Sequence, residues 1–221
     1  MKDFDLITFD CYGTLIDWET GIYEAFRDEA AKDGIELERE RVIAAYAAAE
    51  AQVEGKEFIS YRRVLCEAAR RSASTLGWEI TEERAAFLAR SLPGWRPFPD
   101  TNPALERLGS GFHLGILSNA DDELLAETML HLTVPFDLIV TAEQVQSYKP
   151  RRAHFNEAMR RKGTARWLHA GQSYFHDVRP ALELGIPIAW INRKSKPMPG
   201  GKQKLHCVVN DLTGLADLLG A

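Results

Sequence analysis

The chain has 221 residues, enough for one large domain or for a domain that carries an insertion. Its 45% hydrophobic and 27% charged residues are ordinary for a globular protein, and no apolar run reaches the length of a membrane-spanning helix. The net charge is −5, and the few basic clusters are typical of solvated helix surface without aromatic partners, which argues against nucleic acid as a partner.

The three cysteines are odd in number and far apart, which argues against a disulfide framework and suits a reducing compartment. The N-terminus leads directly into an apolar strand pattern, with no basic segment followed by a long apolar stretch. We therefore expect a cytoplasmic protein with no membrane partner. A homodimer stays open as an oligomeric state, because no residue marks an interface.

The first predicted strand is Leu6–Phe9, a short apolar run that ends at polar and turn residues. Asp10, Gly13 and Thr14 follow it directly. In an open α/β sheet the carboxyl ends of the strands face the ligand crevice, so Asp10 is placed to react with a bound molecule.

Residues 16–96 contain no convincing strand and are predicted to be all helical. Apolar residues recur there at helical spacing, and glycines or Pro93-Gly94 end the segments. Thr81 followed by two glutamates is a typical start for the last of these helices. The four predicted helices span residues 22–34, 38–54, 61–77 and 81–93.

From residue 97 the pattern changes, because prolines mark a boundary and short apolar strands then alternate with helical segments. This alternation is typical of right-handed βαβ units that build a parallel sheet. The predicted fold class is α/β: a Rossmann-like parallel sheet flanked by helices, with an all-helical cap inserted after the first strand. The core domain then comprises residues 1–15 and 97–221, and the cap domain residues 16–96. The further predicted strands are Leu114–Leu117, Leu138–Thr141, Trp167–Ala170, Ile188–Ile191 and Cys207–Val209.

Polar groups that can take part in catalysis follow four of the strands. They are Asp10 after the first, Ser118-Asn119 after the second, Lys149 after the third and Asp177 after the fourth. Each alone has an ordinary explanation as a helix cap or a surface residue. Because strand ends meet at one edge of a parallel sheet, the four together predict an active site.

These groups have a coherent chemistry. A carboxylate such as Asp10 can act as a nucleophile and form a covalent ester or an aspartyl phosphate. A lysine within about 4–6 Å favours the ionised form that attacks. Hydroxyl and amide donors from Thr14, Ser118 and Asn119 are suited to an oxyanion or a substrate carboxylate.

Taken in order, the motifs resemble those of the haloacid dehalogenase superfamily of hydrolases over essentially the whole chain. The resemblance implies that Asp10 is the nucleophile and that the helical insertion is a cap. The four matching motifs are Asp10-Cys11-Tyr12-Gly13-Thr14-Leu15, Leu117-Ser118-Asn119, Lys149-Pro150 and Gly171 to Asp177.

Two positions distinguish branches of this superfamily. Its phosphatases usually carry a second aspartate two residues after the nucleophile and bind magnesium through an acidic fourth motif, but here those positions hold Tyr12 and Gln172. The segments 12–15 and 190–193 instead resemble the L-2-haloacid dehalogenase branch, whose reaction needs no metal.

This resemblance implies roles residue by residue. Asp10 attacks, Thr14 and Lys149 support it, and Asp177 helps to activate the hydrolytic water. The partner is a small organic acid, and no cofactor is expected. The positions implied to bind this substrate are Tyr12, Ser118, Asn119, Gln172 and Tyr174.

The chain also departs from that branch. The branch has a halide-binding arginine in the cap, but residues 43–49 contain none. Arg39 and Arg41, about one turn earlier, stay open as substitutes, although both are more typical of exposed residues at a helix start. Phe155 replaces a tyrosine, and the fourth motif lacks the usual serine and asparagine. A departing halide needs its negative charge stabilised, so these changes leave the leaving group open.

The sequence thus predicts a hydrolase that forms an ester on Asp10 and displaces a leaving group from carbon of a small organic acid. Dehalogenation of 2-haloacids is the first specific hypothesis. Two alternatives stay open. One is a magnesium-dependent phosphatase of small metabolites, which alone would need a metal, and the other is a binding protein that kept the fold and lost the chemistry.

Overall fold

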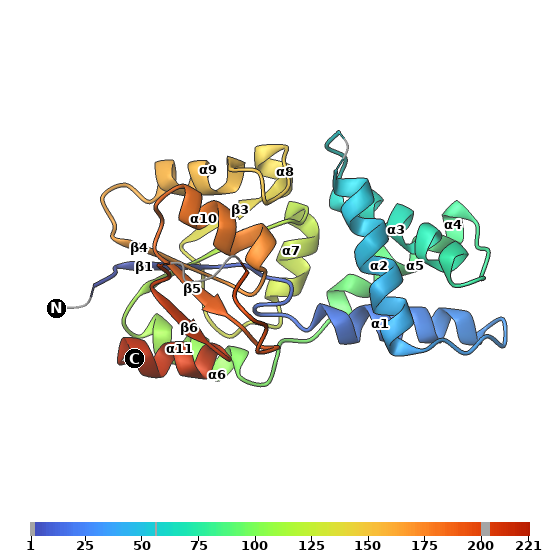
Figure 1. The fold of residues 1–221 in the computed structure, drawn as a ribbon, viewed down its shortest axis with the longest axis horizontal. Coiled ribbons are helices and arrows are strands. Elements are labelled where there is room, and N and C mark those ends of the chain that lie inside the picture. The colour runs from blue at the N-terminus through green and yellow to red at the C-terminus, as the bar shows by residue number, and fades with distance from the viewer. Residues whose placement is uncertain (1–2, 56, 200–203) are drawn as a thin grey trace.

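The computed structural model describes residues 3–55, 57–199 and 204–221. Its centre is a parallel six-stranded sheet, which confirms the predicted α/β class (Figure 1). Each predicted strand is present and differs by no more than one residue at either end. The strands are β1 (Leu6–Phe9), β2 (His113–Ser118), β3 (Leu138–Thr141), β4 (Trp167–Gly171), β5 (Ile188–Ile191) and β6 (Cys207–Val209). Their order across the sheet is β3-β2-β1-β4-β5-β6.

The first strand, β1, lies inside the sheet between β2 and β4. Phe9 is in register with Ile116 of β2 on one side and with Ala170 of β4 on the other. All four β1 residues are buried, as expected for a parallel strand covered by helices on both faces. The chain order reverses at β1, so its carboxyl end opens into the crevice where α/β sheets bind ligands.

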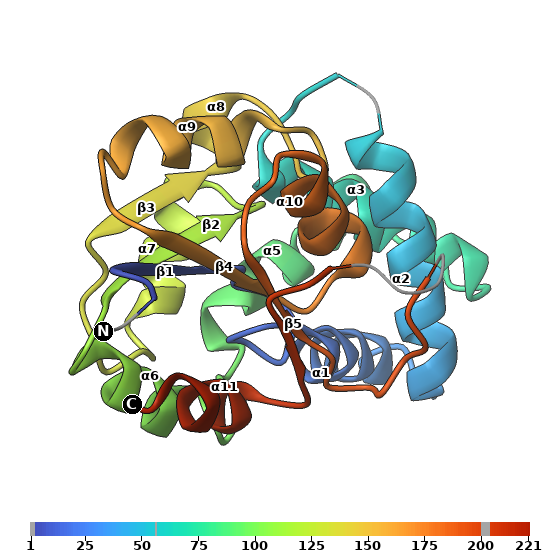
Figure 2. The ribbon, with the colours of Figure 1, turned by 60° about the vertical axis from the view of Figure 1, so that its left-hand side comes forward.

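Helices cover both faces of the sheet (Figures 1 and 2). On one face, α6 (Thr101–Gly109) packs against α11 (Leu212–Leu219). On the other lie α8 (Ala142–Val145), α9 (Ala153–Arg161) and α10 (Arg179–Glu183). The helix that follows β2, α7 (Asp122–Met129), contacts the helical insertion.

The insertion after β1 is helical and stands beside the carboxyl edge of the sheet (Figure 1). Its elements are α1 (Trp18–Ala31), α2 (Arg39–Glu54), α3 (Tyr61–Thr75), α4 (Glu82–Ala85), α5 (Phe87–Ser91) and the 3-10 turn η1 (Leu92–Gly94). The prediction of one helix over 81–93 is wrong, because the backbone N–H of Ala86 bonds to Glu83 and tightens the chain between α4 and α5. No helix in the described part of the chain is long and apolar enough to cross a membrane.

The insertion is tied to the sheet at two places. Its outgoing and returning connections run side by side, with a bridge between Ile16 and Pro97. Asp121, directly after β2, accepts hydrogen bonds from the backbone N–H groups of Tyr61 and Arg62 at 2.7 and 2.8 Å. A carboxylate at this position also favours the positive N-terminal end of α3. Asp121 therefore fixes the start of α3 relative to the sheet edge.

Candidate active site

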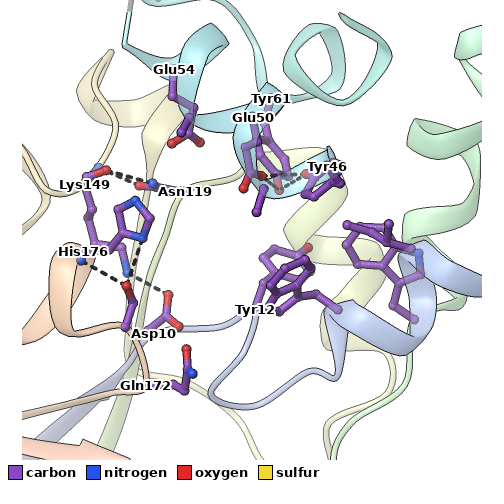
Figure 3. A pocket seen from close by; sticks show the side chains of 16 residues that line it. Asp10, Tyr12, Tyr46, Glu50, Glu54, Tyr61, Asn119, Lys149, Gln172 and His176 are labelled. Carbon is purple, nitrogen blue, oxygen red and sulfur yellow. Dashed lines mark hydrogen bonds and ion pairs between the residues drawn. The ribbon is translucent and has the colours of Figure 1, made fainter. Parts of the chain in front are cut away.

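Asp10 lies at the carboxyl end of β1 and pairs with Lys149, from the loop after α8 (Figure 3). Lys149 Nζ donates to Asp10 Oδ1 and to Asp177 Oδ1, both at 2.7 Å, and to the carbonyl of Leu117 at 2.8 Å. Lys149 is 1% exposed and Asp177 is fully buried, so solvent ions screen these pairs little. One ammonium group thus joins the ends of β1 and β2 to the segment after β4.

The loop after β1 holds the second oxygen of the Asp10 carboxylate. Thr14 Oγ1 donates to Asp10 Oδ2 at 2.8 Å and accepts from the backbone N–H of Gln172 at 2.9 Å. Gly13 has a φ of +100°, which residues with a side chain rarely adopt, and this allows the tight turn before Thr14. With both oxygens bonded, the Asp10 carboxylate has a defined orientation.

Asp177 lies in a π-helical turn, η2 (Tyr174–Val178), shortly after β4. Gly171 permits its close approach, because a Cβ at that position would lie 2.5 Å from the Asp177 Cβ. Asp177 Oδ2 is buried and has no hydrogen-bond partner among the described residues. Because an unpaired buried carboxylate oxygen is costly, Oδ2 is suited to accept a hydrogen bond from a water or a substrate group.

A buried chain of hydrogen bonds supports Asp177 from inside the sheet. Trp167 Nε1 donates to Thr8 Oγ1 at 2.8 Å, and Thr8 Oγ1 lies 2.8 Å from His169 Nδ1. His169 Nε2 faces Asp177 Oδ1 at 3.4 Å. Since an ionised carboxylate only accepts, a neutral His169 carries its proton on Nε2, and Thr8 then donates to Nδ1. Each donor in this series of hydrogen bonds therefore points along it toward Asp177.

The charges in this corner depend on each other. Burial and the neighbouring Asp177 raise the pKa of Asp10, whereas Lys149 and Thr14 oppose that rise. Burial acts against ionisation of Asp177 too, but Lys149 and His169 hold its pKa well below the usual range. Although burial disfavours a charged lysine, the two carboxylates raise the pKa of Lys149. Lys149 is therefore the group that favours the ionised form of both buried carboxylates.

A cavity of about 230 Å³ lies between the sheet edge and the helical insertion, with Asp10 in its wall (Figure 3). The sheet side supplies Asp10, Tyr12, Asn119, Lys149, Gln172, Ser173 and His176. The insertion supplies aromatic side chains and two carboxylates: Trp18, Tyr46, Tyr61, Trp95, Glu50 and Glu54. A cavity of this size takes a small molecule, which would lie beside the Asp10 carboxylate.

Five of the nine predicted site residues line this cavity: Asp10, Tyr12, Asn119, Lys149 and Gln172. Thr14 and Asp177 lie behind them and bond to Asp10 or Lys149. Ser118 and Tyr174 do not line it. The Ser118 hydroxyl is buried and has no hydrogen-bond partner among the described residues. Successive strand residues point to opposite faces, so Ser118 and Asn119 point in different directions. The Tyr174 ring packs on Trp190, 5.6 Å between centroids.

The positions singled out as departures also have defined surroundings. Arg39 donates to Thr20 and lies over the Tyr23 ring, and it is not among the lining residues of the cavity. Arg41 is exposed. Phe155 is fully buried, with its ring edge-on to His169. None of these three residues is among the described residues that line the cavity.

Sequence reasoning missed the wall that α2 contributes. Tyr46, Glu50 and Glu54 lie four residues apart, a spacing that puts them on one helix face. Glu50 accepts hydrogen bonds from the hydroxyls of Tyr46 and Tyr61, at 2.6 and 2.9 Å. The sequence shows this spacing, but it does not show which part of the structure that helix face contacts.

The residues present do not fit a divalent metal. Lys149 Nζ lies between the Asp10 and Asp177 carboxylates, the place where a cation bound by both would have to be. Nowhere in the described ranges do three or more His, Cys, Asp or Glu side chains form a group that could hold a metal ion. Magnesium prefers an octahedral shell of oxygen ligands, which two carboxylates already paired with an ammonium supply poorly.

Comparison with known proteins identifies the family of this chain. The sequence profile of the haloacid dehalogenase-like hydrolases matches residues 4–185. The chain belongs to this family. As a haloacid dehalogenase-like hydrolase, it is 25% identical over 230 residues to an (S)-2-haloacid dehalogenase from Pseudomonas putida, with 99% of this chain and 98% of that protein covered.

Two further proteins are similar to part of this hydrolase or to its fold. A glyceraldehyde 3-phosphate phosphatase from Methanothermobacter thermautotrophicus is 33% identical over 102 residues, which cover 44% of this chain and 45% of the phosphatase. The structure of the L-2-haloacid dehalogenase from Xanthobacter autotrophicus superposes with a TM-score of 0.84 at 20% identity, covering 99% of both chains. At that identity the superposition establishes the fold alone.

Proposed function

We propose that this hydrolase uses Asp10 as a nucleophile to displace a leaving group from carbon of a small organic acid, without a metal. The observation that carries the proposal is Lys149 Nζ, 2.7 Å from the carboxylates of both Asp10 and Asp177. An ammonium in that place keeps Asp10 ionised for attack and leaves the reaction no need of a metal cation there.

In the first step an Asp10 oxygen bonds to the substrate carbon, and the leaving group departs with the electron pair of the broken bond. In the second step water attacks the carbonyl carbon of the Asp10 ester, and the ester bond breaks to give an alcohol and free Asp10. We assign to the unpaired Asp177 Oδ2 the acceptance of a hydrogen bond from this water. Thr14 and Lys149 hold the nucleophile in both steps.

Substrate contacts fall to residues that line the cavity. Tyr12 presents its ring, because its hydroxyl lies 2.8 Å from Thr128 Oγ1. Asn119 and Gln172 supply amide groups on the sheet side. Residues 16–96 serve, in this proposal, as a cap domain that covers the reacting centre, which the paired connections at Ile16 and Pro97 support.

The test combines product release with trapping of the ester. Purified protein is incubated with 2-chloropropionate and a chelator in ¹⁸O-labelled water, with protein in excess. We expect chloride release, a transient mass increase on the peptide that contains Asp10, and ¹⁸O in the Asp10 carboxylate, while the product of this single turnover carries no ¹⁸O. Asp10→Asn should abolish all three signals, whereas Asp28→Asn, which removes an exposed carboxylate, should not.

The alternatives give different results in parallel assays. A phosphatase would release phosphate from an aryl phosphate only with Mg²⁺ present, and this outcome without any Asp10 ester of the acid would overturn the proposal. A binding protein would give neither product nor ester with either substrate.

A further inference from the structure

The cavity of this hydrolase is lined by more acidic than basic side chains. Its described lining includes the carboxylates Asp10, Glu50 and Glu54, while Lys149 is its one side chain with a fixed positive charge. Lys149 is already engaged by the two carboxylates of the catalytic corner. Burial lowers the pKa of His176, so its ring adds no positive charge near neutral pH.

Glu50 is held inside the cavity by the cap itself. Glu50 Oε1 accepts hydrogen bonds from Tyr46 and Tyr61, whose side chains are 1% and 5% exposed. Its second oxygen, Oε2, accepts no hydrogen bond from the described residues. Both bonds come from hydroxyl groups and both end on Oε1, so Glu50 has one oxygen available to a ligand in the cavity.

Glu54 follows one turn later on α2, and Figure 3 shows its carboxylate pointing into the same cavity. No described residue donates a hydrogen bond to it. Burial and the proximity of Glu50 raise the pKa of Glu54, although Lys149 and the exposed Arg151 act against this rise. A positive group in the cavity would oppose this repulsion and favour the ionised form of Glu54.

Aromatic rings complete the surroundings of this acidic pair. The ring centroids of Trp18 and Tyr46 are 5.9 Å apart, and Tyr12 lies 5.9 Å from Trp95 and 6.4 Å from Tyr61. All five rings line the cavity. The faces of such rings attract cations, especially alkylammonium groups removed from water. The carboxylates and the rings therefore point independently to the same kind of ligand.

We propose that the substrate is an organic acid that also carries an ammonium group, and that Glu50 and Glu54 bind this group beneath the cap. The proposal rests on the proposed function and names its substrate class: the reacting carbon faces Asp10 and the ammonium faces α2. A second carboxylate beneath the cap would instead meet Glu50 and Glu54, an unfavourable contact that weakens the binding of such substrates.

Binding of β-alanine and propionate, which differ by one ammonium group, tests the selection. Isothermal titration of the full chain should give about tenfold tighter binding of β-alanine, the gain expected from a desolvated cation beside aromatic rings and carboxylates. The double variant Glu50→Gln, Glu54→Gln should lose this preference and bind propionate at least as well as before. Glu40→Gln, an exposed position on the same helix, removes a charge of the same sign and should change neither ligand.

The outcomes separate cleanly. Equal or tighter binding of propionate by the unaltered chain, or no binding of β-alanine at millimolar concentration, overturns the ammonium site. Glu54→Gln alone leaves both tyrosine bonds to Glu50 in place and should still weaken β-alanine binding, which guards against a fold defect in the double variant. Because binding requires no attack by Asp10, a failed ester trap with an intact β-alanine preference would locate the error in the proposed chemistry alone.

Discussion

Replacement of Lys149 by methionine should destabilise the protein strongly, because it leaves two buried carboxylates facing each other without a cation. Methionine keeps the unbranched apolar stem of lysine and removes only the ammonium. Asp10 is 8% exposed and Asp177 is fully buried, so neither can turn to water to compensate. The variant therefore isolates the electrostatic contribution of this one group.

The magnitude follows from the two contacts of Lys149 Nζ. Opposite unit charges at the observed 2.7 Å attract by about 6 kcal/mol at an effective dielectric constant of about 20. The cost of bringing the charges out of water offsets much of this attraction. In practice, removal of one partner of a buried ion pair lowers stability by about 3–5 kcal/mol. We expect a loss of about 4 kcal/mol in the free energy of unfolding, or a fall in Tm of about 8–16 °C for a chain of this size.

The loss should also depend on pH. Without Lys149, burial and mutual repulsion raise the folded-state pKa values of Asp10 and Asp177 above those of the unfolded chain. The folded variant then binds more protons than the unfolded one, so its stability falls as pH rises and recovers as pH is lowered. In the unaltered protein the pKa of Asp177 is depressed, so that part of its stability is lost as pH falls. The gap between the two proteins should shrink from about pH 7 to about pH 5.

Urea unfolding followed by circular dichroism at both pH values measures this gap. Lys32→Met serves as the control, because Lys32 pairs with Glu29 at 2.6 Å but its side chain is 65% exposed, and such surface pairs contribute about 0–1 kcal/mol. A Lys149→Met protein within about 1 kcal/mol of the unaltered chain, or a deficit that does not change with pH, would refute the electrostatic reasoning.

Two further substitutions test how the site is built. Gly171→Ala places a Cβ 2.5 Å from the Cβ of Asp177, so we expect a loss of about 1–3 kcal/mol in urea unfolding together with loss of Asp10 ester formation. Ser118→Ala removes a buried hydroxyl that has no partner in the described part of the chain, and we expect unchanged or slightly higher stability and turnover within about twofold. A large fall in kcat/KM for Ser118→Ala would return Ser118 to the substrate-binding residues.

The sheet was predictable because its strands are short apolar runs between strong turn signals. Leu6–Phe9 is buried along its whole length, so no alternation had to be interpreted. The contact of Lys149 with Asp10, 139 residues apart in sequence, followed from the rule that strand ends meet at one edge. The local apolar pattern and the topology of the sheet predict the same structure here, so a site of this kind can be located from the sequence.

The direction in which side chains point at this edge was harder to predict from the sequence. Asn119 and Ser118 are neighbours after the same strand, yet Asn119 lines the cavity and the Ser118 hydroxyl is buried away from it. A motif gives the position of a residue along the chain, but a step of one residue reverses the face it presents. The divided helix at Ala86 was likewise missed, because a single tightened turn leaves no compositional mark.

The helical structure of residues 16–96 could be predicted, but not that α2 places two glutamates in the cavity that Asp10 lines. That depends on how α2 docks, and the structure shows what sets its position. Asp121, at the sheet edge, bonds the backbone N–H of Tyr61, and the hydroxyl of Tyr61 bonds Glu50. Two hydrogen bonds thus connect the edge that bears Asp10 to the carboxylate opposite it. In the proposed function the core fixes which atom attacks and this link fixes the charge that the substrate must match, so the two properties can change independently in evolution and in experiment.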